Sequence, residues 1–576
     1  MTFPGRQARD TALRLQTWSS ARSLLLLTAV TLACLLPFSG KAFNIDDPLF
    51  VWSAQQIAKQ PLDPYGFQVI WYRTITPMSQ VMMNPPLASY YAAMIGAVAG
   101  WSERALHLGF LLPTLALVLG IYRLAQRLTR SPLVATAATL LTPGVLVSAS
   151  SVMCDIMMLA FWIWAILFWL EGLESGKQRY WLAAGLLMAA AALTKYFGIC
   201  LVPLLFVYSV ARQRRLGAWA WYFVLPISLL AGYEFCTSIP YGHGLLSAAL
   251  LYAPQRAAEA RSSILLYPFA CASFIGGCTL SALALAPLVW PRKYILIVLL
   301  VEAAVFAAAW VIFGSHLRAT HTGMALHHHG ITIGPELALC IAGGVSVLAL
   351  AALDLWEHRD AESFLLALWV FGTFVFTAFV NWTINARSIL PLIPAAGILL
   401  ARRLDALGIA SAKPLQWKVA IALVISGLVS LWIAKADADW ANSARQAAQL
   451  IAERTSNQTG AVWFQGHWGF QYYMEQLGMH PFDFNQSTLR QGDLLVIPRG
   501  DTNIQTPPAQ FVASDEMMEI PLRQPVMTMH PALEAGFYAS FSGVLPFGFG
   551  KVPPEPYHVF RMGTTTRAVQ WAHPQP

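Results

Sequence analysis

Long apolar stretches alternate with short polar segments over most of this chain. From Ser23 to Ile433, apolar runs of about 17–25 residues recur, and each is long enough to cross a bilayer as a helix. We expect thirteen spans, near residues 23–39, 104–126, 133–149, 155–172, 180–194, 197–211, 217–236, 263–289, 294–313, 333–353, 363–381, 387–402 and 417–434. The pattern predicts a polytopic α-helical membrane protein.

The basic residues between the spans predict which side of the membrane each loop faces. Lys and Arg gather in alternate short loops, for example in residues 123–130, 212–215 and 402–418, and that side is expected to be the cytoplasm. The N-terminus lies on the same side, and its first span is expected to be a retained signal anchor. The first long loop and everything after about residue 435 then lie outside.

Residues 1–435 are expected to form the membrane domain and residues 436–576 a second, extracytoplasmic domain. Within the first outer loop, residues 40–103, Leu49–Ile57 and Leu87–Ala99 have helical apolar spacing with aromatic residues, which predicts two helices lying along the membrane surface. After residue 435 the chain is polar and rich in Pro and Gly. Short β-like runs at Gly460–Phe464 and Asp493–Ile497 predict a small α/β domain there.

Composition supports the membrane assignment and argues against a nucleic-acid-binding protein and against a small domain held together by disulfides. The chain has 576 residues, of which 57% are hydrophobic, well above the usual share in a soluble protein. The formal net charge is +8, but the basic residues follow the short loops, so we predict no nucleic-acid partner. The seven cysteines lie in or beside apolar segments, and no disulfide framework is indicated.

Charged residues make up only 11% of the chain, so the ones at the ends of spans are conspicuous. An acidic pair follows the first span directly, and isolated charged residues begin or end later spans on the same outer side. These residues are Asp46, Asp47, Arg73, Arg104, Asp155, Lys195 and Arg387. A carboxylate at such a face can act as a general base, and cations there can hold a phosphate leaving group.

Each of these residues also has a purely structural interpretation. Asp47 and Asp155 could be N-caps of the helices that follow them. Lys195 could extend its ammonium group to the membrane interface, and Arg387 could pair with a lipid headgroup. The residue types alone leave both interpretations open, whereas their common location on one membrane face favours a functional site.

The order of these motifs resembles that of the GT-C glycosyltransferases. The resemblance rests on the acidic pair after the first span, on the lone Asp155, on Thr194-Lys195, and on the runs 84–91 and 387–394. It covers roughly residues 20–435 and is closest to the branch that holds protein O-mannosyltransferases and the aminoarabinose transferases of lipid A. It implies a GT-C fold with about thirteen transmembrane helices.

The resemblance also implies an activity and roles for the residues. Such enzymes transfer a sugar, usually with inversion, from a polyprenyl monophosphate to a lipid, glycan or protein acceptor outside the membrane. Asp46 would be the catalytic base or the acid that binds the acceptor, with Asp47 as its neighbour and Asp155 completing the acidic site. Lys195, Arg73 and Arg387 would bind the donor phosphate. The chain departs from the family in having Asn84 where a basic residue is common, and Asp47 where Glu is common.

Two further features leave cofactors and binding partners undecided. His321 and His327–His329 lie in a predicted outer loop, residues 314–332, which is expected to be solvated or to contact substrate rather than to bind a metal. Some members of the family bind a divalent cation near the acids, so a cation is possible here but no cofactor is assigned. The aromatic run 462–473 fits either a sugar-stacking surface or a domain core.

The resemblance therefore implies a hexosyl- or pentosyltransferase of the bacterial inner membrane that uses a lipid-linked donor. A transporter or lipid flippase is the main alternative, although such proteins place ionisable groups near the bilayer midplane, often within inverted repeats. A non-catalytic scaffold or receptor is the third. The sequence does not identify the sugar or the acceptor, and it gives no oligomeric state.

Overall fold

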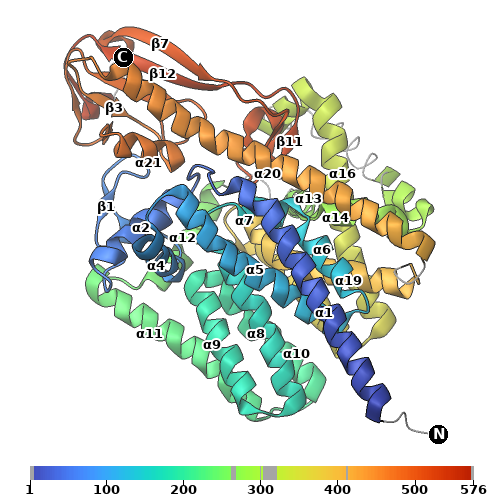
Figure 1. The fold of residues 1–576 in the computed structure, drawn as a ribbon. Coiled ribbons are helices and arrows are strands. Elements are labelled where there is room, and N and C mark those ends of the chain that lie inside the picture. The colour runs from blue at the N-terminus through green and yellow to red at the C-terminus, as the bar shows by residue number, and fades with distance from the viewer. Residues whose placement is uncertain (1–5, 261–266, 299, 302–320, 410–412, 572–576) are drawn as a thin grey trace.

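The computed structural model describes residues 6–260, 267–298, 300–301, 321–409 and 413–571. Within these residues, eight helices are long and apolar enough to cross a membrane, or ten spans if two bent helix pairs each count as one. A polytopic helical architecture is confirmed, and Figure 1 shows the helices packed side by side beneath a C-terminal region that contains strands. The spans that agree with the prediction are Ala21–Phe38, Glu103–Leu128, Asp155–Ser175, Tyr196–Gln213, Ala218–Tyr241, Ile333–His358, Ala361–Val380 and Leu415–Thr455.

The remaining predicted spans take other forms. The run near 180–194 is helix α9 (Gln178–Thr194), which has 17 residues and lies at the lower limit of spanning length. The run near 387–402 is divided into α18 (Ala386–Ile389) and α19 (Ile393–Ala406) by a 3₁₀ turn. Much of the run near 294–313 lies outside the described residues. The total of thirteen spans therefore stays a prediction.

Two predicted spans are sharply bent. Helices α6 (Pro132–Leu140) and α7 (Pro143–Ala149) meet at 63°, and α13 (Tyr267–Cys278) and α14 (Leu280–Val289) meet at 85°. Pro143 begins α7, and proline at that position cannot continue the hydrogen bonding of a preceding helix. The bent pairs contact each other, since a Cβ on Gly144 would press against the side chain of Ile393 and the carbonyl of Cys278.

Residues 40–103, predicted as the first outer loop and called so below, contain the expected helices at nearly the expected positions. These are α2 (Asp47–Lys59) and α4 (Leu87–Ala99), which pack against each other, with the short hairpin β1 (Gln68–Val69) and β2 (Thr76–Pro77) between them in sequence. The helix α3 (Met78–Val81) completes the loop. Their location along a membrane surface stays a prediction. Because α2 begins at Asp47, its first turn brings the acidic pair to the end of the membrane helices.

The remaining helices belong to the bundle or its loops, apart from α21, which lies between β3 (Val462–Phe464) and β4 (His480–Pro481) in the C-terminal region (Figure 1). They are α1 (Arg6–Leu35), α5 (Glu103–Leu128), α8 (Asp155–Ser175), α10 (Leu201–Gln213), α11 (Val224–Tyr241), α12 (Leu245–Ala260), α16 (His321–His358), α17 (Ala361–Val375), α20 (Lys413–Thr455) and α21 (Trp468–Gln476). Helix α16 begins at His321, so the histidine-rich stretch predicted as part of a loop is helical instead. The earlier part of that predicted loop, residues 314–320, lies outside the described residues.

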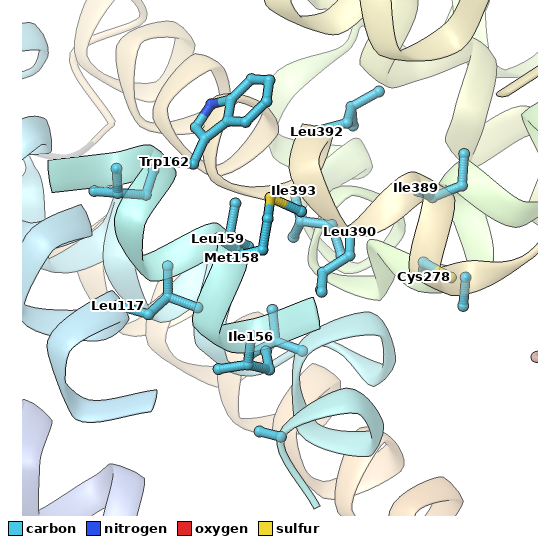
Figure 2. Packing of buried hydrophobic residues seen from close by; sticks show 14 of the residues in the cluster. Leu117, Ile156, Met158, Leu159, Trp162, Cys278, Ile389, Leu390, Leu392 and Ile393 are labelled. Atoms are coloured by element: carbon cyan, nitrogen blue, oxygen red, sulfur yellow. The ribbon is translucent and has the colours of Figure 1, made fainter. Parts of the chain in front are cut away.

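Helix α8 packs at the centre of the core. Figure 2 shows Met158, Leu159 and Trp162 of α8 near Leu390 and Ile393, which continue the helical run that contains Arg387. Between membrane helices such side chains stabilise the bundle through close van der Waals packing, since the surrounding lipid is as apolar as their neighbours. This packing brings the start of α8, with Asp155, beside α18, with Arg387, although the two residues are 232 positions apart.

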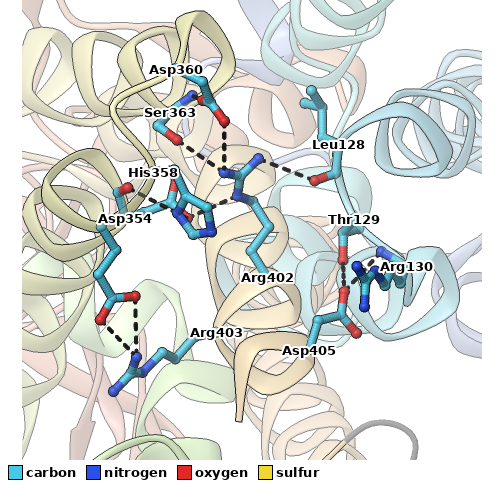
Figure 3. A network of polar contacts seen from close by, with 11 residues as sticks. Leu128, Thr129, Arg130, Asp354, His358, Asp360, Ser363, Arg402, Arg403 and Asp405 are labelled. Atoms are coloured by element: carbon cyan, nitrogen blue, oxygen red, sulfur yellow. Dashed lines mark hydrogen bonds and ion pairs between the residues drawn. The ribbon is translucent and has the colours of Figure 1, made fainter. Parts of the chain in front are cut away.

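A polar network lies at the other end of the bundle (Figure 3). Arg402 donates to Asp354 at 2.8 Å, to Ser363 at 2.9 Å and to the Leu128 carbonyl at 3.3 Å. These bonds link α19, α16 and α17 to the end of α5. At the beginning of α5, Glu103 instead pairs with Arg445 of α20 at 3.0 Å. The 26 residues of α5, about 39 Å of helix, thus separate two polar faces.

The C-terminal region contains a five-stranded mixed sheet in the order β4-β3-β6-β12-β7. Its strands are β3 (Val462–Phe464), β4 (His480–Pro481), β6 (Leu494–Pro498), β7 (Val512–Ile520) and β12 (Glu555–Met562). β3 is parallel to β4 and β6, whereas β12 is antiparallel to β6 and β7. The two strands expected from the sequence are therefore present as β3 and β6.

The polar C-terminal residues are closely joined to the membrane helices. Helix α20 runs without a break from Lys413 to Thr455, so the change in composition near residue 435 falls inside a helix. The short strands β8 (Val526–Met527), β9 (Met529–His530), β10 (Ala535–Gly536) and β11 (Gly548–Phe549) belong to a segment whose apolar side chains pack into the core of the bundle. We call residues 524–550 the C-terminal strap.

Candidate active site

The two residues of the acidic pair lie in different environments, directly after an unusual backbone conformation at Ile45. Ile45 has φ = 50°, in the left-handed region that β-branched residues rarely adopt. The residue is also buried, so its packing holds this conformation. Directly after it, Asp46 directs its carboxylate toward α18, and Asp47 directs its carboxylate into the protein. Two adjacent acids therefore have different surroundings.

Asp47 is the structural member of the pair. Its side chain is fully buried, and its two oxygens accept main-chain N–H bonds from Asn44 at 3.0 Å and from Val152 at 2.8 Å. Burial raises the pKa of Asp47 to about 7, while the charge of Lys41 and the two N–H bonds oppose that rise. Asp47 thereby ties the turn that carries Asp46 to the turn that precedes Asp155.

Four charged side chains meet beside Asp46. Arg387 donates from Nη1 to Asp46 Oδ2 at 2.5 Å and from Nε to Asp155 Oδ2 at 2.8 Å. Lys195 donates from Nζ to Asp155 Oδ1 at 2.6 Å. We call Asp46, Asp155, Lys195 and Arg387 the charged quartet. It joins the first outer loop, the start of α8, the end of α9 and α18.

The members of the quartet differ in their access to solvent. The side chain of Asp46 is 29% exposed and that of Lys195 is 20% exposed, whereas Arg387 is 11% and Asp155 only 2% exposed. Asp155 therefore orients the two cations from the buried side of the quartet, and Asp46 is the carboxylate that a substrate can reach. Partly buried charge-assisted hydrogen bonds of this kind hold side chains firmly in place.

Local structure fixes both cations. Helix α18 is capped by Asn385, whose side chain accepts the N–H of Ser388 at 2.8 Å. The N–H of Ala386 donates to the carbonyl of Phe537 in the C-terminal strap at 2.8 Å, so the strap positions the helix that carries Arg387. Lys195 lies where α9 ends and a 3₁₀ turn begins, a break that directs its side chain toward Asp155.

Arg73 lies in another part of the molecule. Its guanidinium is 5.3 Å from the ring centre of Phe484, and its carbonyl accepts the N–H of Phe484 at 2.9 Å. It therefore contributes to the contact between the first outer loop and the C-terminal region. Of the six residues proposed from the sequence, four form the quartet, Asp47 supports it, and Arg73 packs on Phe484.

One buried ion pair beside the site was not expected from the sequence. Lys41 Nζ lies 2.5 Å from Asp437 Oδ2, and their side chains are 1% and 0% exposed. Asp437 also accepts hydrogen bonds from Thr528 at 2.6 Å and from Tyr538 at 3.0 Å, both in the C-terminal strap. Lys41 is close to the acidic pair in sequence, but its partner is 396 residues away, so only the isolated charges could have drawn attention to them.

Comparison with known proteins agrees with this architecture. Residues 83–233 match the family model described as dolichyl-phosphate-mannose-protein mannosyltransferase. The structure of ArnT from Cupriavidus metallidurans bound to undecaprenyl phosphate aligns with a TM-score of 0.51 and 14% identity, covering 82% of this chain and 93% of that one. The chain has the GT-C fold of membrane glycosyltransferases. The resemblance seen in the sequence is thus confirmed.

Other GT-C structures align less closely. ArnT in the apo state gives a TM-score of 0.44 at 14% identity, covering 84% of this chain and 94% of that one. The archaeal oligosaccharyltransferase AglB from Archaeoglobus fulgidus gives 0.47 at 11% identity, covering 82% of this chain and 66% of that one. No curated protein matches the chain significantly.

The quartet of this GT-C protein does not suit a divalent cation. Two carboxylates and two cations balance in charge, and both acids already accept bonds from Arg387. Mg²⁺ and Ca²⁺ prefer several oxygen ligands that carry an excess of negative charge. Among the described residues, no group of three or more His, Cys, Asp or Glu side chains is arranged to hold a metal ion. The arrangement suits an anion that exchanges places with a carboxylate on the cations.

Proposed function

We propose that this protein transfers a sugar from a polyprenyl-phosphate donor to an acceptor on the outer face of the bacterial inner membrane. The observation that carries the proposal is the charged quartet, in which one accessible carboxylate lies beside two cations at the end of the membrane helices. The ArnT structure, determined with undecaprenyl phosphate, supports a donor of this class. The acceptor is a lipid, a glycan or a protein.

In the proposed reaction, Asp46 accepts the proton of an acceptor hydroxyl. The hydroxyl oxygen forms a bond to the anomeric carbon of the sugar as the bond from that carbon to the phosphate oxygen breaks. The electron pair leaves with the polyprenyl phosphate, and a single displacement of this kind inverts the anomeric configuration. General-base assistance of this type contributes roughly 10²–10⁴-fold to the rate.

Lys195 and Arg387 would stabilise the phosphate as it leaves. Arg387 presents a planar guanidinium suited to phosphate oxygens, and Lys195 adds a second charge nearby. An incoming phosphate would compete with Asp46 for Nη1 of Arg387. Once released from that bond, the carboxylate of Asp46 is free to accept a hydrogen bond from the acceptor hydroxyl, so donor binding would prepare the residue that starts the reaction.

In this proposal, the N-terminus lies in the cytoplasm and the C-terminal region lies outside, as the basic loops predict. The first outer loop, residues 40–103, and residues 436–576 would then cover the site from the outer side. Arg73 would contact the donor phosphate only if the first outer loop moved during the reaction, because Arg73 packs on Phe484.

Replacing Asp46 with Asn tests the proposal. Membranes from cells that carry the wild-type gene, the Asp46→Asn variant or no gene would be compared by mass spectrometry of surface glycans and lipids. We expect a glycosylated product that is lost in the variant, while Glu453→Gln, an exposed acid on α20, keeps it. Undiminished product with Asp46→Asn would contradict the proposed role. Substrate flux in proteoliposomes without covalent transfer would favour a transporter instead.

A further inference from the structure

A cleft of about 500 Å³ lies between α2, the β1–β2 hairpin and the C-terminal region, apart from the charged quartet. Its lining includes Trp52, Gln55 and Gln56 of α2, with Phe67 and Gln68 beside the hairpin and Glu475 of α21. Its volume is in the range of clefts that bind small organic ligands. The cleft is therefore large enough for part of a substrate.

Aromatic rings and amide groups line the same cleft. The ring of Trp52 is held by an edge-on contact with Trp71 at 6.1 Å between centres and by Tyr472 at 6.0 Å. A fixed indole ring offers a flat apolar face against which the C–H groups of a sugar can pack. Gln55, Gln56 and Gln68 each provide two N–H donors and a carbonyl acceptor, which suit hydroxyl groups in either direction.

Much of this hydrogen-bonding capacity is free to bind a ligand. Within the part of the chain that the structure describes, the side chains of Gln55 and Gln68 make no hydrogen bond to protein, and Gln56 bonds only to Gln60, at 3.2 Å. Glu475 accepts one bond from Gln471 at 2.7 Å, and burial raises the pKa of Glu475. The side-chain amides of Gln55 and Gln68 are thus available to form hydrogen bonds with a ligand in the cleft.

The charge of the cleft favours a neutral ligand. Its lining contains one cation, Lys59, and one acid, Glu475, which balance each other. A phosphate or sulfate group would find no cluster of cations there, in contrast to the pair formed by Lys195 and Arg387 in the quartet. An acyl chain would cover the amides of Gln55 and Gln68 without giving them partners, which costs free energy for buried polar groups.

The cleft and Asp46 are joined by one helix. Asp46 immediately precedes α2, and Gln55 and Gln56 are nine and ten residues further along the chain. At 1.5 Å per residue, this separation is about 13–15 Å along the helix axis. A ligand that contacts both regions therefore has to extend over more than one sugar unit.

We propose that this cleft binds the acceptor and that the acceptor is a neutral oligosaccharide. Only the statement that the bound glycan is the acceptor rests on the proposed function. Glycan binding by the cleft can be measured without any sugar transfer. The ring of Trp52 would stack on one sugar unit, and Gln55 and Gln68 would hold its hydroxyls. A sugar further along the chain would then present its hydroxyl to Asp46.

The test measures binding by full-length protein in detergent to an array of neutral and acidic bacterial oligosaccharides and Ser/Thr peptides. The Asp46→Asn background removes turnover. We expect binding to neutral oligosaccharides, and about tenfold weaker binding for the double variant Gln55→Ala/Gln68→Ala. Gln476→Ala, which changes an exposed glutamine at the end of α21 outside the cleft lining, is the matched control and should bind like the parent.

The outcomes separate this inference from the proposed function. No glycan binding, or binding that the double variant retains in full, would overturn the inference even if the wild-type enzyme still transfers sugar. Binding to peptides in place of glycans would also overturn it and would indicate a protein acceptor. Glycan binding that depends on Gln55 and Gln68, together with an absence of sugar transfer by the wild-type protein, would support the cleft and contradict the proposed reaction. Elution of each variant as a single folded species excludes unfolding as the cause.

Discussion

Arg387 joins Asp46 to Asp155 through two different nitrogens, Nη1 at 2.5 Å from Asp46 and Nε at 2.8 Å from Asp155. A guanidinium can make both bonds at once because its N–H groups diverge in one plane. The accessible acid and the buried acid are therefore held in one arrangement by a single side chain, which leads to a direct test.

Replacing Arg387 with Lys should lower sugar transfer about 100-fold, because one ammonium group cannot reproduce both bonds and the planar contact with phosphate. The measurement is product formation in membranes at matched protein levels. Arg402→Lys provides the control: Arg402 is equally exposed, at 11%, and also bonds to an acid, but in the network at the other end of the bundle. Loss of transfer in both variants to the same extent would indicate a general structural effect.

Asp46 and Asp47 should respond differently to the same substitution. Asp47→Asn turns an amide N–H toward a main-chain N–H and leaves one buried donor unpaired, at a cost of about 1–3 kcal/mol. Asp46→Asn removes one partly exposed ion pair, which contributes about 0–1 kcal/mol. Thermal unfolding in detergent should therefore show the larger loss for Asp47→Asn. A larger loss for Asp46→Asn would contradict the structural role assigned to Asp47.

The buried pair Lys41–Asp437 should matter mainly for stability. Lys41→Met leaves the charge of Asp437 buried without its cation, which costs about 3–5 kcal/mol. The double variant Lys41→Met/Asp437→Asn removes both charges and keeps an oxygen that can accept from Thr528 and Tyr538, so it should regain much of the loss. Thermal unfolding of both variants measures this. Equal stability of the single and double variants would show that the pair does not tie the strap to the bundle.

Glu555 should make the stability of the protein depend on pH. Burial raises its pKa from 4.5 to about 7, while its bond from the Trp440 indole N–H, at 3.1 Å, opposes the rise. Between those pH values the folded state binds more protons than the unfolded state, so the free energy of unfolding falls as pH rises and levels off above about 7.

Glu555→Gln keeps the acceptor for Trp440 and removes the titration. The variant should match the wild type near pH 5 and exceed it by about 1–3 kcal/mol at pH 8. Thermal unfolding of both proteins from pH 5 to pH 8 measures the difference in their stability at each pH. Because both proteins contain the other buried acids, such as Asp47, whose pKa is also raised, this difference reports on Glu555 alone. A constant difference across this range would contradict the prediction.

The apolar pattern along the sequence was sufficient to predict most of the helical architecture, because each membrane helix satisfies its own backbone hydrogen bonds and must be long enough to cross the bilayer. The spacing of apolar residues also predicted α2 and α4, and short β-like runs predicted the strands β3 and β6. Composition did not predict the true extent of α20, since a helix can continue from lipid into water without changing its backbone. The boundary expected near residue 435 lies within that helix for this reason.

The sequence alone also showed that rare charges lie at the ends of membrane spans, since charge in hydrocarbon is costly and therefore conspicuous. It could not determine which of these charges meet. Tertiary packing decided that Asp46, Asp155, Lys195 and Arg387 form one cluster and that Arg73 packs on Phe484. It also decided the different roles of two neighbouring acids, because Asp46 meets Arg387 whereas Asp47 meets main-chain N–H groups. Contacts between residues hundreds of positions apart follow from how helices pack, and no local pattern encodes them.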